Sequence, residues 1–170
     1  MKTSFVILRM LRVLSLLAFI VVLFWCYTSL PLEVAVHYDQ KNRADLFITK
    51  SQLFYGLAAF IVLFNTVFSL LANLIPSLPA SRLSLLNQQY WQENKEYLQN
   101  IVVNWLHSLV VAVNIFLISC LAVILVLNTS DNAKVSSYGW LAIVGGVILL
   151  GWLAFLPLRQ MVKTATLEEA

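Results

Sequence analysis

Four long apolar runs, separated by polar segments, dominate the pattern of this chain; they cover approximately residues 11–30, 53–75, 101–127 and 138–158. Each run is close to the roughly 20 residues that an α-helix needs to cross the hydrocarbon core of a bilayer. The runs are continuously apolar rather than alternating, and unpaired backbone groups are costly in lipid, so helices are expected and barrel strands are not. The pattern predicts an all-α membrane protein with four transmembrane helices.

The connections between these runs favour one membrane domain over residues 1–170, folded as an antiparallel bundle of neighbouring helices. A loop over residues 31–52 joins the first two helices, and a longer one over residues 76–100 joins the second and third. The first run is too long for a secretory h-region and lacks a small-x-small cleavage site, so it is expected to remain as the first anchor.

A pattern of period two interrupts the helical one in the loop over residues 31–52. Its apolar positions are Leu32, Val34, Val36 and Tyr38. This alternation predicts a short strand, and Asn42 suits a turn because it accepts a positive φ more readily than most residues. A second extended piece follows at Leu46–Thr49. Because an isolated hairpin is marginal in water, we expect it to lie on the helix ends and to bury Val34, Val36 and Phe47 there.

The loop over residues 76–100 begins with two prolines and continues with apolar residues at helical spacing. These positions are Leu83, Leu86, Tyr90 and Tyr97. Tyr90 and Trp91 suit the level of the lipid headgroups. We therefore predict an interfacial segment that leads into the third helix, either as a solvated helix entry or as a surface for a partner.

Polar side chains inside two of the predicted helices are the main candidates for a membrane site. This intramembrane polar stripe consists of Asn65, Ser69 and Asn73 in the second helix and Asn104, His107, Ser108 and Asn114 in the third. We expect the two faces to meet, with Asn65 close to Asn114 at the bilayer centre. The stripe serves either as interhelical hydrogen bonding that fixes the register or as a pathway for a proton or small solute. The sequence places no Asp, Glu, Lys or Arg in a helix core, which leaves His107 as the titratable group at depth.

Composition supports the membrane prediction, with 61% hydrophobic and only 11% charged residues. The net charge of +3 is spread over the loops, so nucleic-acid binding is not expected. Of the eleven Lys and Arg residues, the termini and the loop over residues 76–100 carry Lys2, Arg9, Arg12, Arg82, Lys95, Arg159 and Lys163; the other side carries Lys41, Arg43, Lys50 and Lys134. By the positive-inside rule, both termini are predicted to be cytoplasmic and the loop over residues 31–52 faces outward.

Titratable residues gather in that outer loop, and His37, Asp39 and Asp45 are of types that bind metals. Three ligands with the positive charges of Lys41 and Arg43 close by give little support to a metal site. Hydrogen bonding that stabilises the loop is favoured instead, with Asp45 accepting turn N–H groups or pairing with Lys50. The two cysteines fall in predicted helices without metal or redox spacing. No nucleophile with an orienting base can be named, so neither an enzyme, a metal nor a cofactor is expected.

The fourth helix carries a small-xxx-small face at Ala142 and Gly146, with Gly145 and Gly151 nearby. Such a face allows close helix approach. It serves packing within the bundle or between copies in a homo-oligomer.

The outer loop also resembles a known family. Its residues Leu30, Pro31, Val34, His37, Tyr38, Asp39, Asn42, Asp45 and Lys50 follow the LPxxVPxHxxxxGxxDxxxxK pattern of a bacterial membrane domain of unknown function. That domain forms the N-terminal part of SdpI-type immunity proteins, which protect a bacterium from its own secreted peptide toxin. Asn87, Tyr90 and Trp91 are similar to the N-x-x-Y-W entry of stand-alone members. The family's second proline is Ala35 here, and its glycine is Asn42.

This resemblance, which covers about residues 11–127, implies a stand-alone member of the domain in the bacterial inner membrane. We expect a non-enzymatic protein that binds or shields against a peptide or envelope partner through its outer loop. The candidate recognition residues are Pro31, His37, Tyr38, Asp39, Asn42, Asp45 and Lys50. The alternative is a small transporter or channel component that uses the intramembrane polar stripe. A dry interface between the second and third helices favours the former, and a water-accessible cavity reaching His107 favours the latter.

Overall fold

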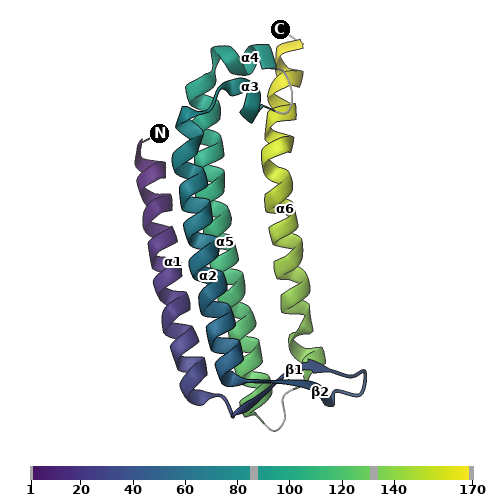
Figure 1. Cartoon of the computed structure of the whole chain (residues 1–170). Coiled ribbons are helices and arrows are strands. Elements are labelled where there is room, and N and C mark those ends of the chain that lie inside the picture. Colours follow the sequence, from purple (N-terminus) through teal and green to yellow (C-terminus); the bar gives the residue numbers. More distant parts are fainter. Residues whose placement is uncertain (1, 85–87, 131–133, 169–170) are drawn as a thin grey trace.

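The computed structural model describes residues 2–84, 88–130 and 134–168, which are mostly helical (Figure 1). In chain order the elements are α1 (Lys2–Ser29), β1 (Glu33–Tyr38), β2 (Ala44–Thr49), α2 (Lys50–Leu74), the 3-10 turn η1 (Ile75–Ser77), α3 (Ala80–Leu83), α4 (Gln88–Glu93), α5 (Lys95–Thr129) and α6 (Val135–Glu168). Leu86 and Asn87, which the sequence patterns used, lie outside the described residues.

Four of these helices are long and apolar enough to cross a membrane. The membrane-spanning segments are Val6–Ser29, Lys50–Ser77, Lys95–Thr129 and Ser137–Leu156. Large apolar side chains on them remain exposed in the isolated chain; Val21, for example, is 67% exposed. Exposed apolar side chains on long helices are what lipid contact requires. The chain thus has the architecture of a multi-pass membrane protein.

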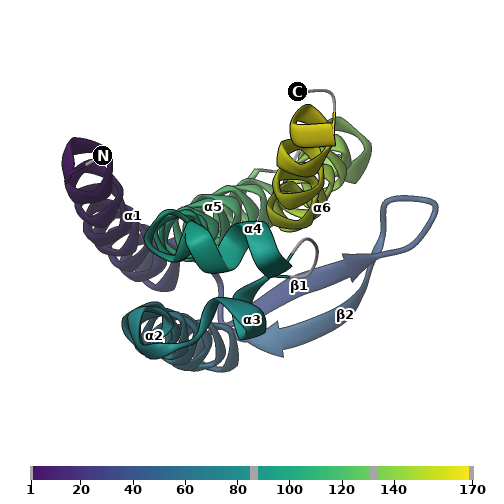
Figure 2. The ribbon, with the colours of Figure 1, turned by 90° about the horizontal axis from the view of Figure 1, so that it is seen from above.

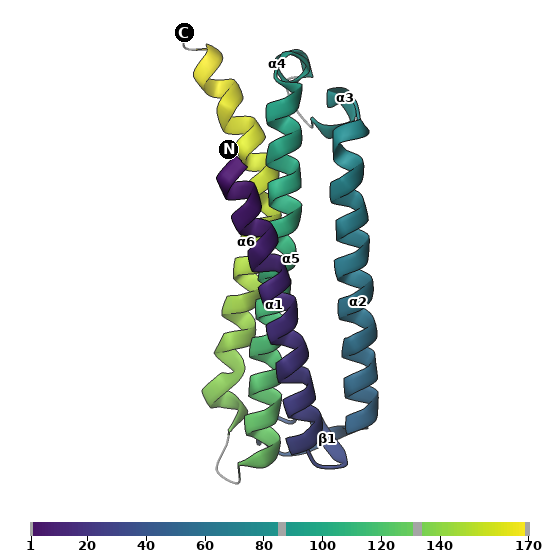
Figure 3. The same cartoon turned by 90° about the vertical axis from the view of Figure 1, so that its left-hand side faces the viewer.

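The hairpin of β1 and β2 lies at one end of the helices, and the short helices α3 and α4 lie at the other (Figure 1). We call these the hairpin end and the α3–α4 end. Helix α1 lies along α5, and α2 also contacts both of them, whereas α6 packs against α5 (Figures 1 and 3). Seen from above in Figure 2, the beginning of α1 stands apart from α2, and the two helices approach each other towards the hairpin end.

Two apolar clusters fill the interior, one at each end. The hairpin-end cluster consists of Phe19, Leu23, Cys26, Leu30, Val34, Ile61 and Leu121. The α3–α4 cluster consists of Ala72, Ile75, Ala80, Trp91, Leu98, Ile101, Val102, Val103 and Leu106. The buried polar residues Ser15, Asn65, His107 and Asn114 lie between these two sets along their helices. A polar layer therefore separates the two apolar clusters.

The limits of α2 follow from local chemistry at each end. Thr49 and Gln52 form a capping box, in which Thr49 Oγ1 accepts the N–H of Gln52 and Gln52 Oε1 accepts the N–H of Thr49. At the other end Pro76 stops the helix in η1. Gln99 of α5 donates to the carbonyl oxygens of Pro76 and Leu78, at 3.1 Å each. This contact satisfies carbonyl groups that the broken helix leaves open.

Trp91 is fully buried in the α3–α4 cluster. The interpretation of this residue as an anchor among lipid headgroups is therefore wrong, because its ring has no exposed surface to offer them. Its ring packs edge-on against Tyr90 and is stacked with Tyr97. The segment before α5 is folded onto the helices through Trp91.

Candidate functional site

Asn65 of α2 and Asn114 of α5 are the centre of the polar layer. Asn65 Nδ2 donates to Asn114 Oδ1 at 3.2 Å, and also to the carbonyl of Ile61 at 3.0 Å. Both side chains are buried, and Asn114 is completely so. The expectation that Asn65 lies close to Asn114 is confirmed.

The contacts of these two residues continue to α1 and return to α2. Asn114 Nδ2 donates to Ser15 Oγ at 3.0 Å, and Ser15 Oγ donates to the carbonyl of Arg12 at 2.9 Å. The Nη2 group of Arg12 in turn donates to the carbonyl of Asn65. A ring of hydrogen bonds thus joins α1, α2 and α5. Such a ring fixes the relative register of the three helices.

Arg12 is the residue of this site that the sequence reasoning missed. It was assigned to the entrance of the first helix, but α1 begins at Lys2, and Arg12 lies inside the span Val6–Ser29. The statement that no charged residue lies within a helix core is therefore wrong. The spacing of Arg9, Arg12 and Ser15 was the available signal, because residues three apart share one helical face.

The guanidinium of Arg12 also contacts His107 of α5, with 3.3 Å between Nη1 and Nδ1. Because arginine can only donate, Nδ1 accepts, and the imidazole is neutral with its proton on Nε2. Arg12 thus contacts two uncharged acceptors. Ion pairs of His37 with Asp45 and of Arg43 with Asp39 lie in the hairpin, far from Arg12 in sequence. Within the described part of the chain, the charge of Arg12 has no carboxylate partner.

A polar cavity of about 430 Å³ lies beside this network between α1, α2 and α5. Its polar lining residues are Arg9, Arg12, Asn65, Ser69, Asn73 and His107. A second cavity of about 350 Å³, the end cavity, adjoins it towards the α3–α4 end and shares Arg9 and Asn73. Glu96, Gln99 and Asn100 line the end cavity. The stripe of α2 thus faces a hollow that reaches His107.

The stripe of α5 is divided between two sides of that helix. His107 and Asn114 face α1 and α2, as expected. Ser108 instead lines an apolar cavity of about 460 Å³ between α5 and α6, and its hydroxyl donates to carbonyls of its own helix, those of Asn104 and Trp105. The prediction of one continuous polar face is therefore wrong for Ser108, because a hydroxyl can be satisfied by the preceding turn. Asn104 accepts that bond through its backbone, not its side chain.

The polar cavity is closed towards the hairpin end. Phe54 of α2 packs against Phe24 and Tyr27 of α1, with ring centroids 5.3 and 4.8 Å apart. The hairpin-end cluster fills the space between the same helices. The cavity lies on the other side of these contacts, in the direction in which α1 and α2 diverge (Figure 2). The cavity is thus one-sided.

The hairpin of β1 and β2 is antiparallel, and Asn42 at its turn has φ of 59°. The expected strand, turn and second strand are present. A bulge at Val36 interrupts the alternation, because Ala35 pairs with Phe47 and the next pair is His37 with Leu46. Val34 and Ala35 are both buried, whereas Phe47, which pairs with Ala35 and so faces away from Val34, is 50% exposed. The predicted burial of Phe47 is wrong.

Asn128 near the end of α5 fastens β1 to the helices. Its Oδ1 accepts the N–H of Ala35 at 2.8 Å, and its Nδ2 donates to the carbonyl of Ala35 at 3.1 Å. Alanine at position 35, unlike a proline, has a backbone N–H, and this N–H donates to Asn128. This contact was not foreseeable, because residues 93 positions apart in sequence provide it.

The turn is organised by Asp39 rather than Asp45. Asp39 Oδ1 accepts the N–H groups of Lys41 and Arg43 at 2.8 Å each, and its Oδ2 accepts Arg43 Nε at 3.0 Å. These hydrogen bonds from Arg43 and Lys41 lower the pKa of the Asp39 carboxyl. Asp45 instead pairs with His37. The expected partners of Asp45, the turn N–H groups or Lys50, are wrong.

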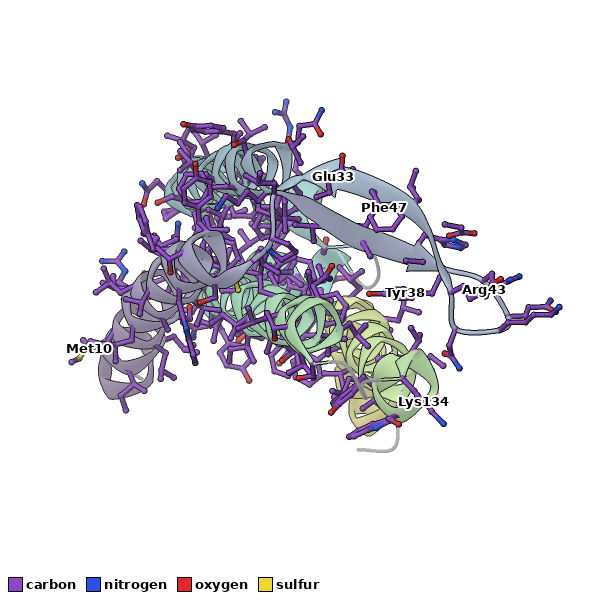
Figure 4. All side chains as sticks on the ribbon, turned by 90° about the horizontal axis from the view of Figure 1, so that it is seen from below. Met10, Glu33, Tyr38, Arg43, Phe47 and Lys134 are labelled. Atoms are coloured by element: carbon purple, nitrogen blue, oxygen red, sulfur yellow. The ribbon has the colours of Figure 1, made fainter. Side chains whose placement is uncertain are left out.

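The other candidate residues of the outer loop are dispersed. Lys50 lies over the ring of Tyr27, 5.2 Å from its centroid, and Pro31 is exposed. Tyr38 borders a cavity of about 320 Å³ between β1, α5 and α6, and burial raises the pKa of its hydroxyl. Figure 4 shows Arg43 at the far tip of the hairpin, away from the helices. The seven candidates thus do not form a common site, and no group of three metal-ligating side chains occurs among the described residues.

Comparison of this chain with protein-family models, curated proteins and solved structures finds no match. The resemblance to the SdpI-associated domain therefore has no support from these comparisons. Function is therefore inferred from the chemistry of the site itself.

Proposed function

We propose that this chain is a non-enzymatic ligand-binding protein of the bacterial inner membrane, of the class of small transporter or channel components. In this proposal the polar cavity between α1, α2 and α5 holds a small polar ligand. The main support for this proposal is the contact between Arg12 and His107 on the wall of a cavity, which lies between helices long enough to span a membrane.

The chemistry of the cavity exceeds what helix packing needs. Neutral amides such as Asn65 and Asn114 are sufficient to join helices in lipid. A guanidinium in the same layer is expensive there, and charged groups at such depth usually serve a ligand or ion. The hairpin-end cluster fills the space beyond the ring of hydrogen bonds. A one-sided binding cavity is therefore proposed rather than an open pore.

Cysteine accessibility tests this function. In a background with Cys26→Ala and Cys120→Ala, Ser69→Cys places a thiol on the cavity wall. Leu70→Cys is the matched control, because Leu70 is the next residue of α2 and is 58% exposed on the apolar surface. We expect a charged, membrane-impermeant thiosulfonate to modify Ser69→Cys, and not Leu70→Cys, in membranes open on both sides.

Both thiols should react fully after denaturation, which excludes an oxidised cysteine as the cause of low labelling. If Ser69→Cys in intact membranes is as unreactive as Leu70→Cys, the cavity is dry. The proposed function would then be wrong.

Partner binding by the hairpin is the second candidate function. It is favoured by the outer edge of β2, which pairs with no other strand in the described part of the chain, beside the exposed Leu46 and Phe47. An unpaired edge of this kind can accept an extended peptide as an additional strand. This mode fits a peptide or envelope partner.

A double variant tests the hairpin candidate. Leu46→Asp with Phe47→Asp should fail to complement the envelope-stress or toxin-sensitivity phenotype of a deletion strain. Lys41→Asp at the exposed turn should complement it. Membrane levels of the three proteins must be equal. Full complementation by the double variant would exclude the edge of β2 as a binding surface.

A further inference from the structure

We infer that the polar cavity binds a phosphate group, and that Arg12 is the residue that recognises it. This inference rests on the proposed function and names the ligand class of the same cavity. The ligand chemistry is a phosphate ester or free phosphate, with the headgroup of an anionic phospholipid and a soluble phosphate as its two sources.

The polar cavity carries positive charge on its walls. Arg12 contacts the carbonyl of Asn65 and the ring of His107, both uncharged. A second arginine, Arg9, lines the same cavity. The adjoining end cavity is lined by Glu96 as well as by Arg9. The described lining of the polar cavity itself holds two guanidinium groups and no carboxylate, so an anion bound there reduces the cost of the intramembrane charge of Arg12.

The walls of the polar cavity offer hydrogen-bond donors and an acceptor to a ligand. The contacts of Arg12 engage one N–H of Nη1 and one of Nη2, so further guanidinium N–H groups are available to a ligand. Planar guanidinium groups match phosphate oxygens in pairs. Ser69 and Asn73 add a hydroxyl and an amide on α2. Asn65 Oδ1 is buried without a hydrogen-bond partner, so the cavity also offers an acceptor for a ligand hydroxyl.

The position of the polar cavity favours a lipid as the source of the phosphate. Val13 lines it and is 58% exposed on the apolar surface of α1. One wall therefore continues into a surface suited to acyl chains. Asn65 lies nine residues before the end of α2 at Leu74, a rise of about 14 Å. The end cavity, which shares Arg9 and Asn73 with the polar cavity, lies on the α3–α4 side, so a headgroup is expected to enter from that side.

Lipid binding to the full chain in detergent tests this inference. Native mass spectrometry would measure the binding of phosphatidylglycerol and of phosphatidylcholine with equal chain length. Thermal unfolding would measure how far each lipid, inorganic phosphate and glycerol phosphate raise the unfolding temperature. We expect at least a tenfold preference for phosphatidylglycerol over phosphatidylcholine, and Arg12→Gln should reduce it about tenfold, the scale of a lost charge-assisted hydrogen bond. Arg82→Gln removes the same charge from the exposed surface of α3 and should leave the preference unchanged.

A second variant covers the case in which Arg12→Gln fails to fold. Ser69→Asp places a carboxylate in the cavity opposite the arginines, so it should abolish the phosphatidylglycerol preference while maintaining or raising the unfolding temperature. Stabilisation of the wild type by phosphate and glycerol phosphate, lost in Ser69→Asp, would support the site and identify a soluble source. Stabilisation by phosphatidylglycerol alone would support it and identify a lipid.

Equal binding of the two lipids together with no stabilisation by phosphate would overturn the inference, as would an equal loss of preference in Arg82→Gln and Arg12→Gln. This failure differs from failure of the proposed function. A reactive Ser69→Cys thiol with no phosphate preference leaves a hydrated cavity for another ligand. An unreactive thiol removes the cavity itself.

Discussion

Asn114 makes more interhelical contacts than its size suggests, because its amide accepts from Asn65 of α2 and donates to Ser15 of α1. An interhelical hydrogen bond in lipid contributes only about 0.6 kcal/mol on average. The penalty for leaving a buried partner unsatisfied is larger, because that group loses its hydrogen bond and stays buried. The value of Asn114 therefore lies in the two other side chains that it keeps paired.

Asn114→Ala is expected to lower the free energy of unfolding by about 1–3 kcal/mol, because it leaves Asn65 Nδ2 without its partner on α5. The measurement is reversible unfolding of the purified protein in detergent. Asn100→Ala is the matched control, since Asn100 is an exposed asparagine of the same helix, and its loss should change stability by about 0.5 kcal/mol or less. Equal effects of the two substitutions would contradict a special role for Asn114.

Asp39 makes the turn of the hairpin sensitive to acid. Its pKa is lower in the folded hairpin than in an unfolded chain, so the ionised carboxylate stabilises the turn at every pH above its usual pKa of about 3.9. This contribution is lost as the pH falls through the lowered pKa. We expect the NMR amide signals of Lys41 and Arg43 to titrate together with a midpoint below 3.9. Asp39→Asn should abolish the step, and a midpoint at or above 3.9 would disprove the carboxylate as their acceptor.

At the residue scale, spacing was enough to pair Asn65 with Asn114, because both lie near the middle of apolar runs, where a polar side chain must find a partner. It was not enough for Arg12. An arginine near the start of an apolar run is normally assigned to the interface, where its long side chain reaches water. Only the packing of α1 along α5 turns this one towards His107.

At the element scale, the hairpin shows what an alternating pattern can and cannot predict. The period of two indicated a strand, and Asn42 indicated a turn. The bulge at Val36 is absent from the pattern, since it arises where Asn128 holds the backbone of Ala35 against α5. Phe47 pairs with Ala35, the position next to the pair of Val34 with Ile48, so register alone places Phe47 on the face opposite Val34.

The contact between α5 and α6 depends on one glycine of α6. A Cβ at Gly145 would collide with the ring of Phe116 on α5, whereas a Cβ at Gly146 would meet nothing nearby. Close approach of the two helices therefore occurs at Gly145 and not at Gly146 of the small-xxx-small pattern. The side chain of Ala142, the other member of that pattern, lies outside the described set. The fourth helix uses a small residue to pack inside the chain.

This difference gives a matched pair of variants. Gly145→Leu should destabilise the packing of α6 on α5 by about 1–3 kcal/mol, because the ring of Phe116 must move. Gly146→Leu adds the same side chain one residue away and should have little effect on the monomer. Thermal unfolding in detergent measures both. A larger loss for Gly146→Leu would indicate that its face packs against a second copy instead.

At the scale of the whole molecule, the four helices were predictable because apolar length alone separates a membrane span from a soluble helix. Their placement was not. The sequence favoured an antiparallel bundle of neighbouring helices; in the structure α1, α2 and α5 contact one another and α6 packs against α5. Tilt and divergence arise from side chains such as Phe54, which holds α1 and α2 together at one end. A cavity that depends on this divergence cannot be deduced from hydropathy.

The orientation of the molecule decides which lipid leaflet the polar cavity meets. The Lys and Arg distribution predicts that the α3–α4 end is cytoplasmic and that the hairpin faces outward. In the background without Cys26 and Cys120, Lys41→Cys at the hairpin turn should react with an impermeant maleimide in intact cells. Arg82→Cys on α3 should react only after lysis, because the α3–α4 end is predicted to be cytoplasmic. Both positions are exposed in the folded chain, so burial would not prevent either reaction. The reverse labelling would disprove this orientation; α1 and α2 would then diverge towards the outer leaflet, and any phosphate lipid in the cavity would come from there.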